Sequence, residues 1–327
     1  MRRVVAGVVI GAVSAALVAL GGGTAHAADG TAVQQLADAY APIVVIRTQT
    51  TPCGAGEPYL PVSVDSVLGQ PSVTLMGPGG QSLAAPTSAD LAGKGDGWYL
   101  DLPGKPLNPG CDYEQWFAQT WGGKPAVLYA RAATDPDHPG MLALQYWFWW
   151  VFNDWNDKHE GDWEMIQLLF PVGTVEQALT STPESIAFAQ HEGSETAPWA
   201  DTKVHRQGNH IVVYPAAGSH AAYYTQAQWF GKSAAAGFGC DNTLAPGTIL
   251  HPQIQVMPDQ PTPGFEWLSF TGRWGEKAPS FNNGPTGPNT KTQWAHPVTW
   301  QQQGGRSPVD VGRRRSYLYL AHIDGAT

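Results

Sequence analysis

The sequence predicts a mainly β protein, an antiparallel β-sandwich with short helices and long loops. Many segments combine β-branched and aromatic residues, and the loops between them carry Gly, Pro and Asn. Helical patterns are few and short, so the chain does not show the alternating strands and helices of an α/β protein. Short strands with irregular connections are typical of a sandwich. We expect strands at residues 43–48, 98–102, 126–131, 142–152, 163–170, 185–191, 210–214 and 316–322.

Two short helices are expected among these strands. One apolar helical face ends just before Pro42. Residues 174–177 read Thr-Val-Glu-Gln, a capping-box pattern that predicts one or two helical turns. The apolar face of the first helix consists of Val33, Leu36, Ala37 and Tyr40.

The first residues predict export. Arg2 and Arg3 precede an apolar run over residues 4–20, and Ala25-His26-Ala27 forms a cleavage signature. We therefore expect a secretory signal peptide at residues 1–27, a single domain at 28–327 and a secreted product. The longest later apolar run, residues 141–152, is shorter than the ~20 residues that span a bilayer, so no transmembrane segment is expected in the mature chain.

The charge balance excludes one class of partner. The signal segment carries two Arg and no acidic residue, which leaves 16 basic against 27 acidic side chains in the mature chain, a net charge of −11. Such a surface does not favour nucleic acid or anionic lipid. It does attract cations.

Three cysteines in an exported chain raise the question of pairing. Cys53 and Cys111 both lie in Gly/Pro-rich loops, and we expect a disulfide bond between them. Cys240 is then left over, and we expect a buried, inert thiol there. A catalytic thiol is the alternative, but no Cys/His/Asn spacing supports it.

Aromatic residues fill the most unusual strand of the chain. Residues 145–154 read Gln-Tyr-Trp-Phe-Trp-Trp-Val-Phe-Asn-Asp, and residues 159–164 read His-Glu-Gly-Asp-Trp-Glu. We expect the tryptophans of this region to supply much of the core and to fix the position of the loop that follows. These tryptophans are Trp147, Trp149, Trp150, Trp155 and Trp163.

Two carboxylates begin the next strand. Side chains alternate along a strand, so Asp162 and Glu164 project from one face and Trp163 from the other, with Cα atoms of the two acids about 6–7 Å apart. Buried like charges repel, and a divalent cation relieves the repulsion. His159 on the entering loop is placed to complete such a site. The alternative is a structural role, in which these side chains satisfy loop amides and a salt bridge.

Several motifs in order resemble the vacuolar protein sorting-associated protein 62 family, over roughly residues 39–300. The name of this family implies little about chemistry in an exported protein. The motifs are Tyr40-Ala41-Pro42, residues 56–64, residues 144–148 with Asn153, residues 159–164, Gln190-His191, Val213-Tyr214, Gly218-Ser219-His220-Ala221, residues 272–275 and residues 284–288 with Trp294.

Residues 159–164 are also similar to the Gly-His-Arg-His-Asp-Trp-Glu heptad of necrosis-inducing Nep-like proteins. That resemblance implies a β-sandwich and a divalent cation that engages a sphingolipid headgroup. His159, Asp162 and Glu164 match the family's His, Asp and final Glu, and Asp154 is the nearest counterpart of an upstream Asp. The heptad departs from the family at Lys158, Glu160 and Gly161. Cation binding is therefore implied, whereas killing of host cells is not.

Two further histidines are candidates for the same site. His220 is interpreted as a metal ligand or an acid/base residue that folding brings to the cation, with a hydrogen-bonded core histidine as the alternative. His191 has the same possible roles with less support. Gly218-Ser219-His220-Ala221 is not a nucleophile elbow, and Trp163 stands where a zincin would need a second His.

Two functions from different classes follow. The favoured one is a secreted cation-binding protein that recognises a cell-surface glycan or a lipid headgroup. The alternative is a metal-dependent hydrolase acting on a small-molecule ester, phosphate or glycosidic substrate, with His191 or His220 moving the proton. Oxygen ligands with one imidazole favour calcium, magnesium or manganese, and zinc becomes plausible if two or three His converge.

Overall fold

The computed structural model describes residues 30–190, 193–233, 237–278 and 282–303. The expected signal peptide, the expected strand at 316–322 and His191 lie outside these ranges. The described fold is mainly β, with several largely antiparallel sheets and short helices, which confirms the predicted class. None of the described helices is long and apolar enough to cross a membrane.

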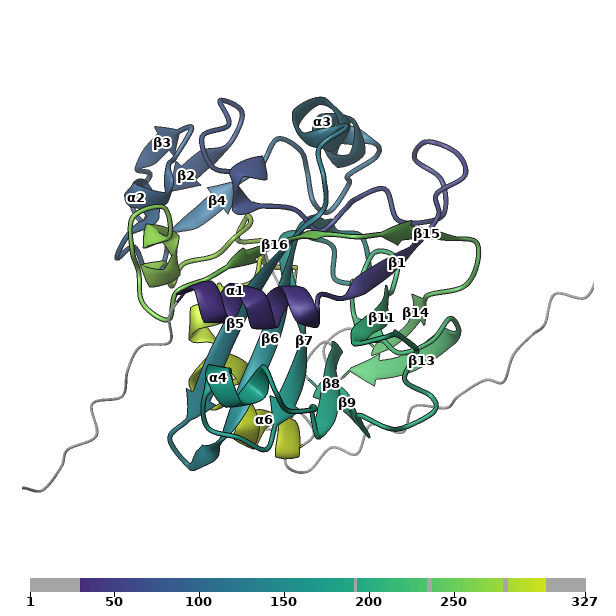
Figure 1. Ribbon diagram of the computed structural model, residues 1–327. Helices are drawn as coiled ribbons and strands as arrows, with labels where there is room; N and C mark the ends of the chain where they lie inside the picture. Colours follow the sequence, from purple (N-terminus) through teal and green to yellow (C-terminus); the bar gives the residue numbers. More distant parts are fainter. Residues whose placement is uncertain (1–29, 191–192, 234–236, 279–281, 304–327) are drawn as a thin grey trace, which may run out of the picture.

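A six-stranded sheet forms the centre of the molecule (Figure 1). All its pairings are antiparallel except that of β16 with β5. Its order is β16 (Gln253–Val256), β5 (Val127–Asp135), β6 (His138–Asn153), β7 (His159–Phe170), β8 (Ser185–Gln190) and β9 (Gly193–Pro198).

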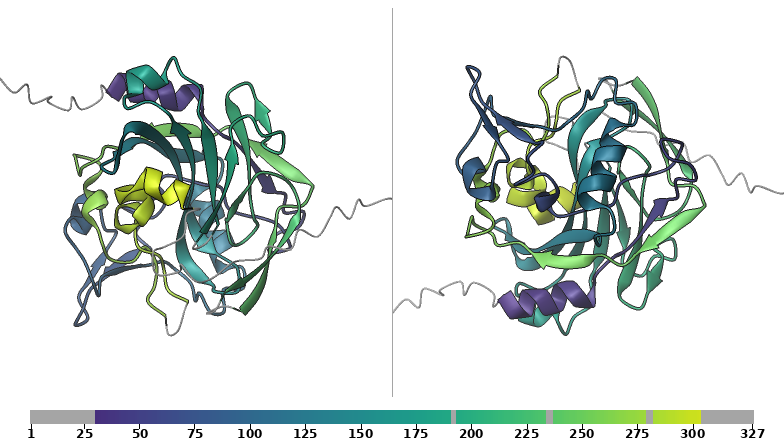
Figure 2. Two further views of the ribbon diagram at one scale, coloured as in Figure 1. Left: turned by 90° about the horizontal axis from the view of Figure 1, so that it is seen from below. Right: turned by 90° about the horizontal axis from the view of Figure 1, so that it is seen from above.

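A second sheet packs against the first (Figure 2). Its buried side chains belong to the same hydrophobic core as those of β6, β7 and β8. β1 pairs with β11 in parallel and with β15 in antiparallel orientation. This sheet contains β10 (Arg206–Gln207), β11 (His210–Pro215), β1 (Ile43–Arg47), β15 (Gly247–Leu250) and β12 (Ala222–Tyr223). Two smaller sheets are β13 (Gln228–Ser233) with β14 (Gly237–Asn242), and β3 (Ser82–Ala84), β2 (Thr74–Met76) and β4 (Tyr99–Asp101).

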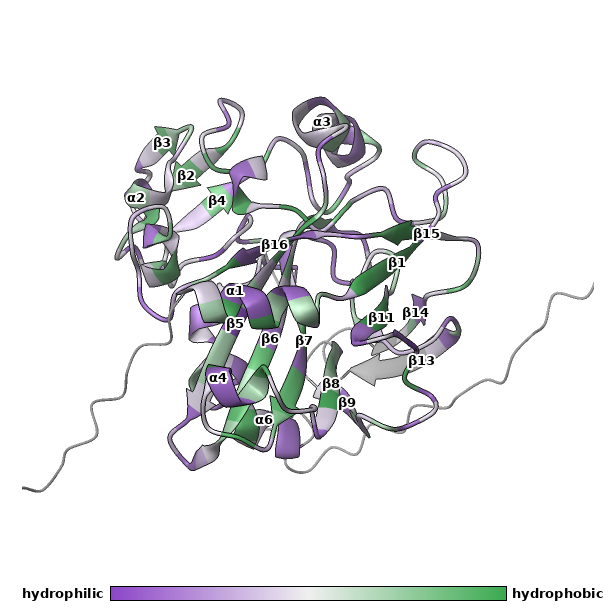
Figure 3. Ribbon diagram, in the orientation of Figure 1, coloured by the Kyte–Doolittle hydropathy of each residue, from purple (hydrophilic) through white to green (hydrophobic). Residues whose placement is uncertain are grey.

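The helices cover the sheets from outside. α1 (Gly30–Ala39) buries the predicted apolar face, and hydrophobic and hydrophilic residues alternate around it in Figure 3. α4 (Val175–Ala178) begins at the predicted cap, where the Thr174 side chain accepts a hydrogen bond from the Gln177 amide. The sequence did not lead us to expect the other helical segments. They are η1 (Val64–Ser66), α2 (Ser88–Leu91), α3 (Asp112–Trp121), η2 (Glu266–Ser269), η3 (Pro288–Thr290), α5 (Thr292–Ala295) and α6 (Pro297–Gln302).

β6 is largely apolar from residue 142 to residue 152 because both of its faces are covered there. On one face the Tyr146 hydroxyl donates a 2.7 Å hydrogen bond to the Ala37 carbonyl in α1. On the other face the Gln145 amide donates a 2.7 Å bond to the Gln293 carbonyl in α5. The whole stretch 142–152 is buried. A strand with no solvent-facing side loses the alternation of polar and apolar residues and reads as a continuous apolar run.

The tryptophans behave as predicted with one exception. Trp147, Trp149, Trp150 and Trp163 are buried in the core. Trp155 is only half-buried, because it lies on the turn between β6 and β7 rather than in a strand.

The cysteine predictions are confirmed for the disulfide and wrong for the third thiol. Cys53 and Cys111 are bonded, with Cα atoms 5.5 Å apart. Cys240 carries a free thiol but is exposed rather than buried, because it lies on β14 in a small two-stranded sheet.

Candidate functional site

The candidate site lies where β6 and β7 meet in a hairpin. Asn153 and His159 form the last pair of the ladder, so His159 is a strand residue and not a loop residue as expected. The Asn153 amide donates 3.2 Å hydrogen bonds to the carbonyl and to the carboxylate of Asp157, which closes the turn. Asp162 is the fourth residue of β7 rather than its first.

The predicted alternation of side chains along β7 is confirmed. Asp162 pairs with Trp150 and Trp163 pairs with Trp149 across the ladder. The rings of Trp149 and Trp163 lie 5.1 Å apart on one face. Asp162 lies on the opposite face, where its Oδ2 is 3.0 Å from Nδ1 of His220.

The structure therefore brings together Asp162 and His220, which are 58 residues apart in the chain. Burial alone would raise the pKa of Asp162, but the hydrogen bond and the charge of His220 hold it below its usual range. Asp162 is thus a buried carboxylate that stays ionised at neutral pH.

His220 is enclosed on several sides. Its ring stacks on Trp150, with centroids 4.2 Å apart and an angle of 6° between the planes. Nε2 lies 3.5 Å from Oε2 of Glu57. Burial favours the neutral ring, yet Glu57 and Asp162 together raise the pKa of His220 to about 9. Because Nδ1 of His220 lies 3.0 Å from Oδ2 of Asp162, this ring can orient the Asp162 carboxylate.

His159 has the arrangement of a metal-binding imidazole. Its Nδ1 lies 2.8 Å from the Gly161 carbonyl oxygen, and only a protonated nitrogen can satisfy that contact. In the neutral ring Nε2 then carries the free lone pair, the usual state of a metal-bound histidine. Asp162 and Glu164 are both buried, at 8% and 7% exposure, and supply the carboxylate oxygens that hard cations prefer. All three side chains are of types that serve as ligands for divalent cations.

The remaining predicted residues are placed differently. The Asp154 side chain is exposed and forms an ion pair with Lys158. The backbone of Asp154 packs closely against Gly218. A Cβ atom added to Gly218 would lie only 2.6 Å from the Asp154 carbonyl oxygen.

Ligand atoms gather more closely in two other groups. Within the described ranges, the sets of three or more His, Cys, Asp or Glu with ligand atoms within 4.8 Å of one another are Asp101, Glu160 and Glu276, and Asp135, Asp137 and His296. The predicted set is not among them. A cation held by His159, Asp162 and Glu164 therefore requires side-chain rotation or additional ligands from water or backbone.

Sequence reasoning missed two buried acids beside the site. Glu57 contacts His220 and lies within the motif at residues 56–64, whose sequence alone does not indicate a role for this acid. Glu160 lies inside the heptad itself. Burial raises the pKa of Glu160 to about 8, against hydrogen bonds from the Tyr113 hydroxyl and from the amides of Leu102 and Glu276. Glu160 thus ties three separate segments to the end of β7.

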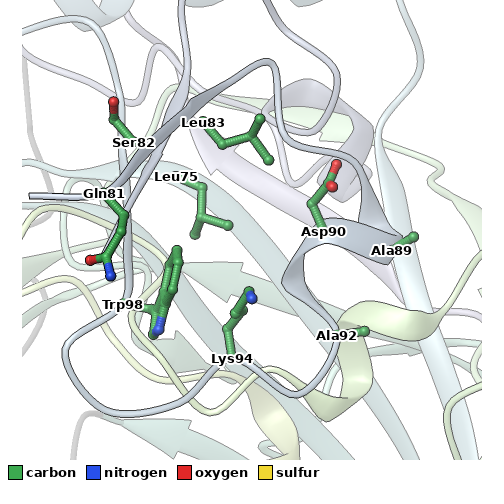
Figure 4. A pocket seen from close by; sticks show the side chains of 9 residues that line it. All are labelled: Leu75, Gln81, Ser82, Leu83, Ala89, Asp90, Ala92, Lys94 and Trp98. Carbon is green, nitrogen blue, oxygen red and sulfur yellow. The ribbon is translucent and has the colours of Figure 1, made fainter. Parts of the chain in front are cut away.

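A separate cavity of about 290 Å³ opens between β2, β3 and α2 (Figure 4). The Lys94 ammonium lies 4.7 Å from the centroid of the Trp98 ring on one wall. Leu75, Leu83 and Asp90 line other parts of it. None of the predicted site residues lines this cavity.

Comparison with known proteins gives structural neighbours only. No family model and no curated protein matches the sequence, so the likeness to the vacuolar protein sorting-associated protein 62 family stays a prediction. The structural neighbours are Nep-like proteins. NLPPya in complex with glucosamine is 15% identical, with 75% of this chain and 76% of that chain covered and a TM-score of 0.34. NLPPya in complex with mannosamine is 16% identical, with 74% and 80% covered and a TM-score of 0.37. The non-toxic HaNLP3 protein is 13% identical, with 69% and 74% covered and a TM-score of 0.34. Values this low do not extend the ligands of those proteins to this chain.

Proposed function

We propose that this chain is a secreted protein that binds a divalent cation through His159, Asp162 and Glu164 and uses it to recognise a glycan or a lipid headgroup at a cell surface. The observation that carries the proposal is the arrangement at the end of the β6–β7 hairpin. β7 begins at an imidazole whose Nδ1 is held by the Gly161 carbonyl, and it carries two buried carboxylates, Asp162 and Glu164. A bound cation would supply coordination positions for hydroxyl or headgroup oxygens.

Each residue has a distinct part in this proposal. Asp162 and Glu164 provide negative oxygen ligands, and His159 provides Nε2. His220 holds one oxygen of Asp162. Calcium, magnesium and manganese suit a donor set of two carboxylates and one imidazole better than zinc does.

Binding is better supported than hydrolysis. A hydrolase needs a histidine or an acid able to exchange a proton with substrate or water. Both ring nitrogens of His220 are directed at carboxylates. The buried ring therefore faces the protein's own carboxylates and is poorly placed to exchange a proton with substrate or water.

Metal titration tests the cation site. Calorimetry with Ca²⁺ and electron paramagnetic resonance with Mn²⁺ should show one site in the folded protein and none in an Asp162→Asn/Glu164→Gln double variant. Asp154→Asn should bind normally if the exposed Asp154 is not a ligand. Asp137→Asn probes the competing group at Asp135, Asp137 and His296. Loss of binding in Asp137→Asn but not in the double variant would refute the proposal.

Ligand screening tests the recognition step. Glucosamine, mannosamine and vesicles with glycosylated sphingolipid headgroups are offered with Ca²⁺ or with EDTA. Binding that requires Ca²⁺ and is lost in the double variant supports the proposal. Turnover of ester, phosphate or glycoside substrates would instead favour the hydrolase.

A further inference from the structure

We propose that Glu57 is a positioning residue of the cation site: it orients the ring of His220, which in turn holds the carboxylate of Asp162. This inference rests on the proposed function insofar as Asp162 is a cation ligand. The chain of contacts from Glu57 to Asp162 stands on the structure alone.

The Glu57 carboxylate is fixed in place. Its Oε1 accepts a 3.0 Å hydrogen bond from the Tyr59 amide, and its Oε2 accepts a 2.8 Å bond from the Gly218 amide. The residue is 3% exposed. Backbone amides thus hold both oxygens, and Oε2 lies 3.5 Å from Nε2 of His220, an ionic contact rather than a hydrogen bond.

The His220 ring is fixed in turn. Trp150 stacks on its face, and Nδ1 reaches Oδ2 of Asp162 at 3.0 Å. Its backbone has a φ of 55°, a left-handed conformation that is uncommon for residues other than glycine. Such strain persists only where the surroundings determine the conformation, and it often accompanies function. A ring held only for packing would not need a carboxylate on each nitrogen.

Glu57 reaches this place because its loop is anchored twice. The Glu57 amide donates a 2.9 Å hydrogen bond to the Arg47 carbonyl at the end of β1. Further out, Cys53 is bonded to Cys111, and the Cys53 amide donates 3.0 Å bonds to the Glu114 carboxylate. The loop at 48–57 thus places the Glu57 carboxylate on the side of the His220 ring that faces away from Asp162.

The consequence for Asp162 is a fixed orientation. With Oδ2 held by His220, the direction of the other oxygen is set before a cation arrives. Partners that orient a metal ligand in this way typically change metal affinity by about 10–100-fold when they are replaced. Replacing His220 itself would remove the side chain that faces both buried carboxylates, so Glu57 is the better position to test.

Glu57→Gln is the informative variant, since it keeps the size of the side chain and removes its charge. We expect the imidazole ¹⁵N signals of His220 to shift or broaden in the metal-free variant, and the Mn²⁺ affinity to fall about 10–100-fold. Glu114→Gln is the matched control. It loosens the same loop without touching His220, so it should leave both measurements unchanged.

Each outcome is decisive. Wild-type His220 signals together with wild-type Mn²⁺ affinity in Glu57→Gln would overturn the inference, as would an equal loss in Glu114→Gln. If Glu57→Gln does not fold, Glu57→Asp keeps the charge but withdraws it from His220 and is measured in the same way. If the wild-type protein binds neither Mn²⁺ nor Ca²⁺, the proposed function fails, while the His220 signals still decide whether Glu57 positions the ring.

Discussion

Gly161, between Glu160 and Asp162, offers a sharp test of how the heptad is built into the core. Its φ is +64°, and a Cβ at this position would overlap the Trp274 carbonyl oxygen and the Trp149 ring. Gly208, in the turn between β10 and β11, has a φ of +65° and nothing within 4 Å of the same Cβ position. The two glycines therefore share a backbone conformation and differ only in their surroundings.

The expected magnitudes follow from this difference. An alanine in the left-handed region costs about 1–2 kcal/mol. Alanine also restricts the unfolded chain more than glycine does, and this offsets about 0.4–1 kcal/mol of that cost. Gly208→Ala should therefore destabilise by about 1 kcal/mol or less. Gly161→Ala adds an overpacking cost of about 1–3 kcal/mol, and we expect the upper part of that range. One obstacle is a backbone carbonyl, and the other is a fully buried ring, so neither can move away easily.

Urea unfolding measures the difference directly. With an m value of about 3 kcal/mol/M, Gly161→Ala should lower the midpoint by about 1 M and Gly208→Ala by about 0.3 M. Equal shifts for the two variants would show that the backbone conformation alone sets the cost. The close packing of Gly161 against Trp149 and Trp274 would then be refuted.

Three other predictions use the same assay. Trp149→Ala should lower the free energy of unfolding by about 3–5 kcal/mol, because the ring is fully buried beside Trp163 and Trp274. Trp155→Ala, at a half-buried position, should lower it by less than half as much. Comparable losses in the two variants would contradict this placement. Burial raises the pKa of Glu160 to about 8, so between about pH 4.5 and pH 8 the folded state holds a proton that the unfolded state has lost. The free energy of unfolding should therefore fall as the pH rises through this range, and it should fall less steeply in Glu160→Gln. An unchanged slope in the variant would count against the raised pKa of Glu160. Removing the disulfide with Cys53→Ser/Cys111→Ser should cost about 4 kcal/mol in the chain-entropy model, while Cys240→Ser, which alters an exposed free thiol, should leave the midpoint unchanged.

Local patterns in the sequence determined much of the fold. Seven of the expected strands lie within the described residues and are present, because alternation, β-branched residues and flanking Gly and Pro act over a few neighbouring residues. The same local rule placed Asp162 and Trp163 on opposite faces of β7. The Cys53–Cys111 bond agrees with the prediction made from two cysteines in Gly/Pro-rich loops and an expected signal peptide.

Only the tertiary structure decided which distant segments meet. Glu57 and Asp162 come from different parts of the chain and approach His220 from opposite sides, an arrangement that no local pattern encodes. The burial of Glu160 and the exposure of Cys240 likewise depend on which segments pack against each strand. The heptad therefore identified where charged side chains gather, because its spacing determines which of its side chains share one face of β7. The residues that set the protonation and orientation of these side chains come from distant segments. Long-range packing brings them into contact, so only the folded structure shows which residues they are.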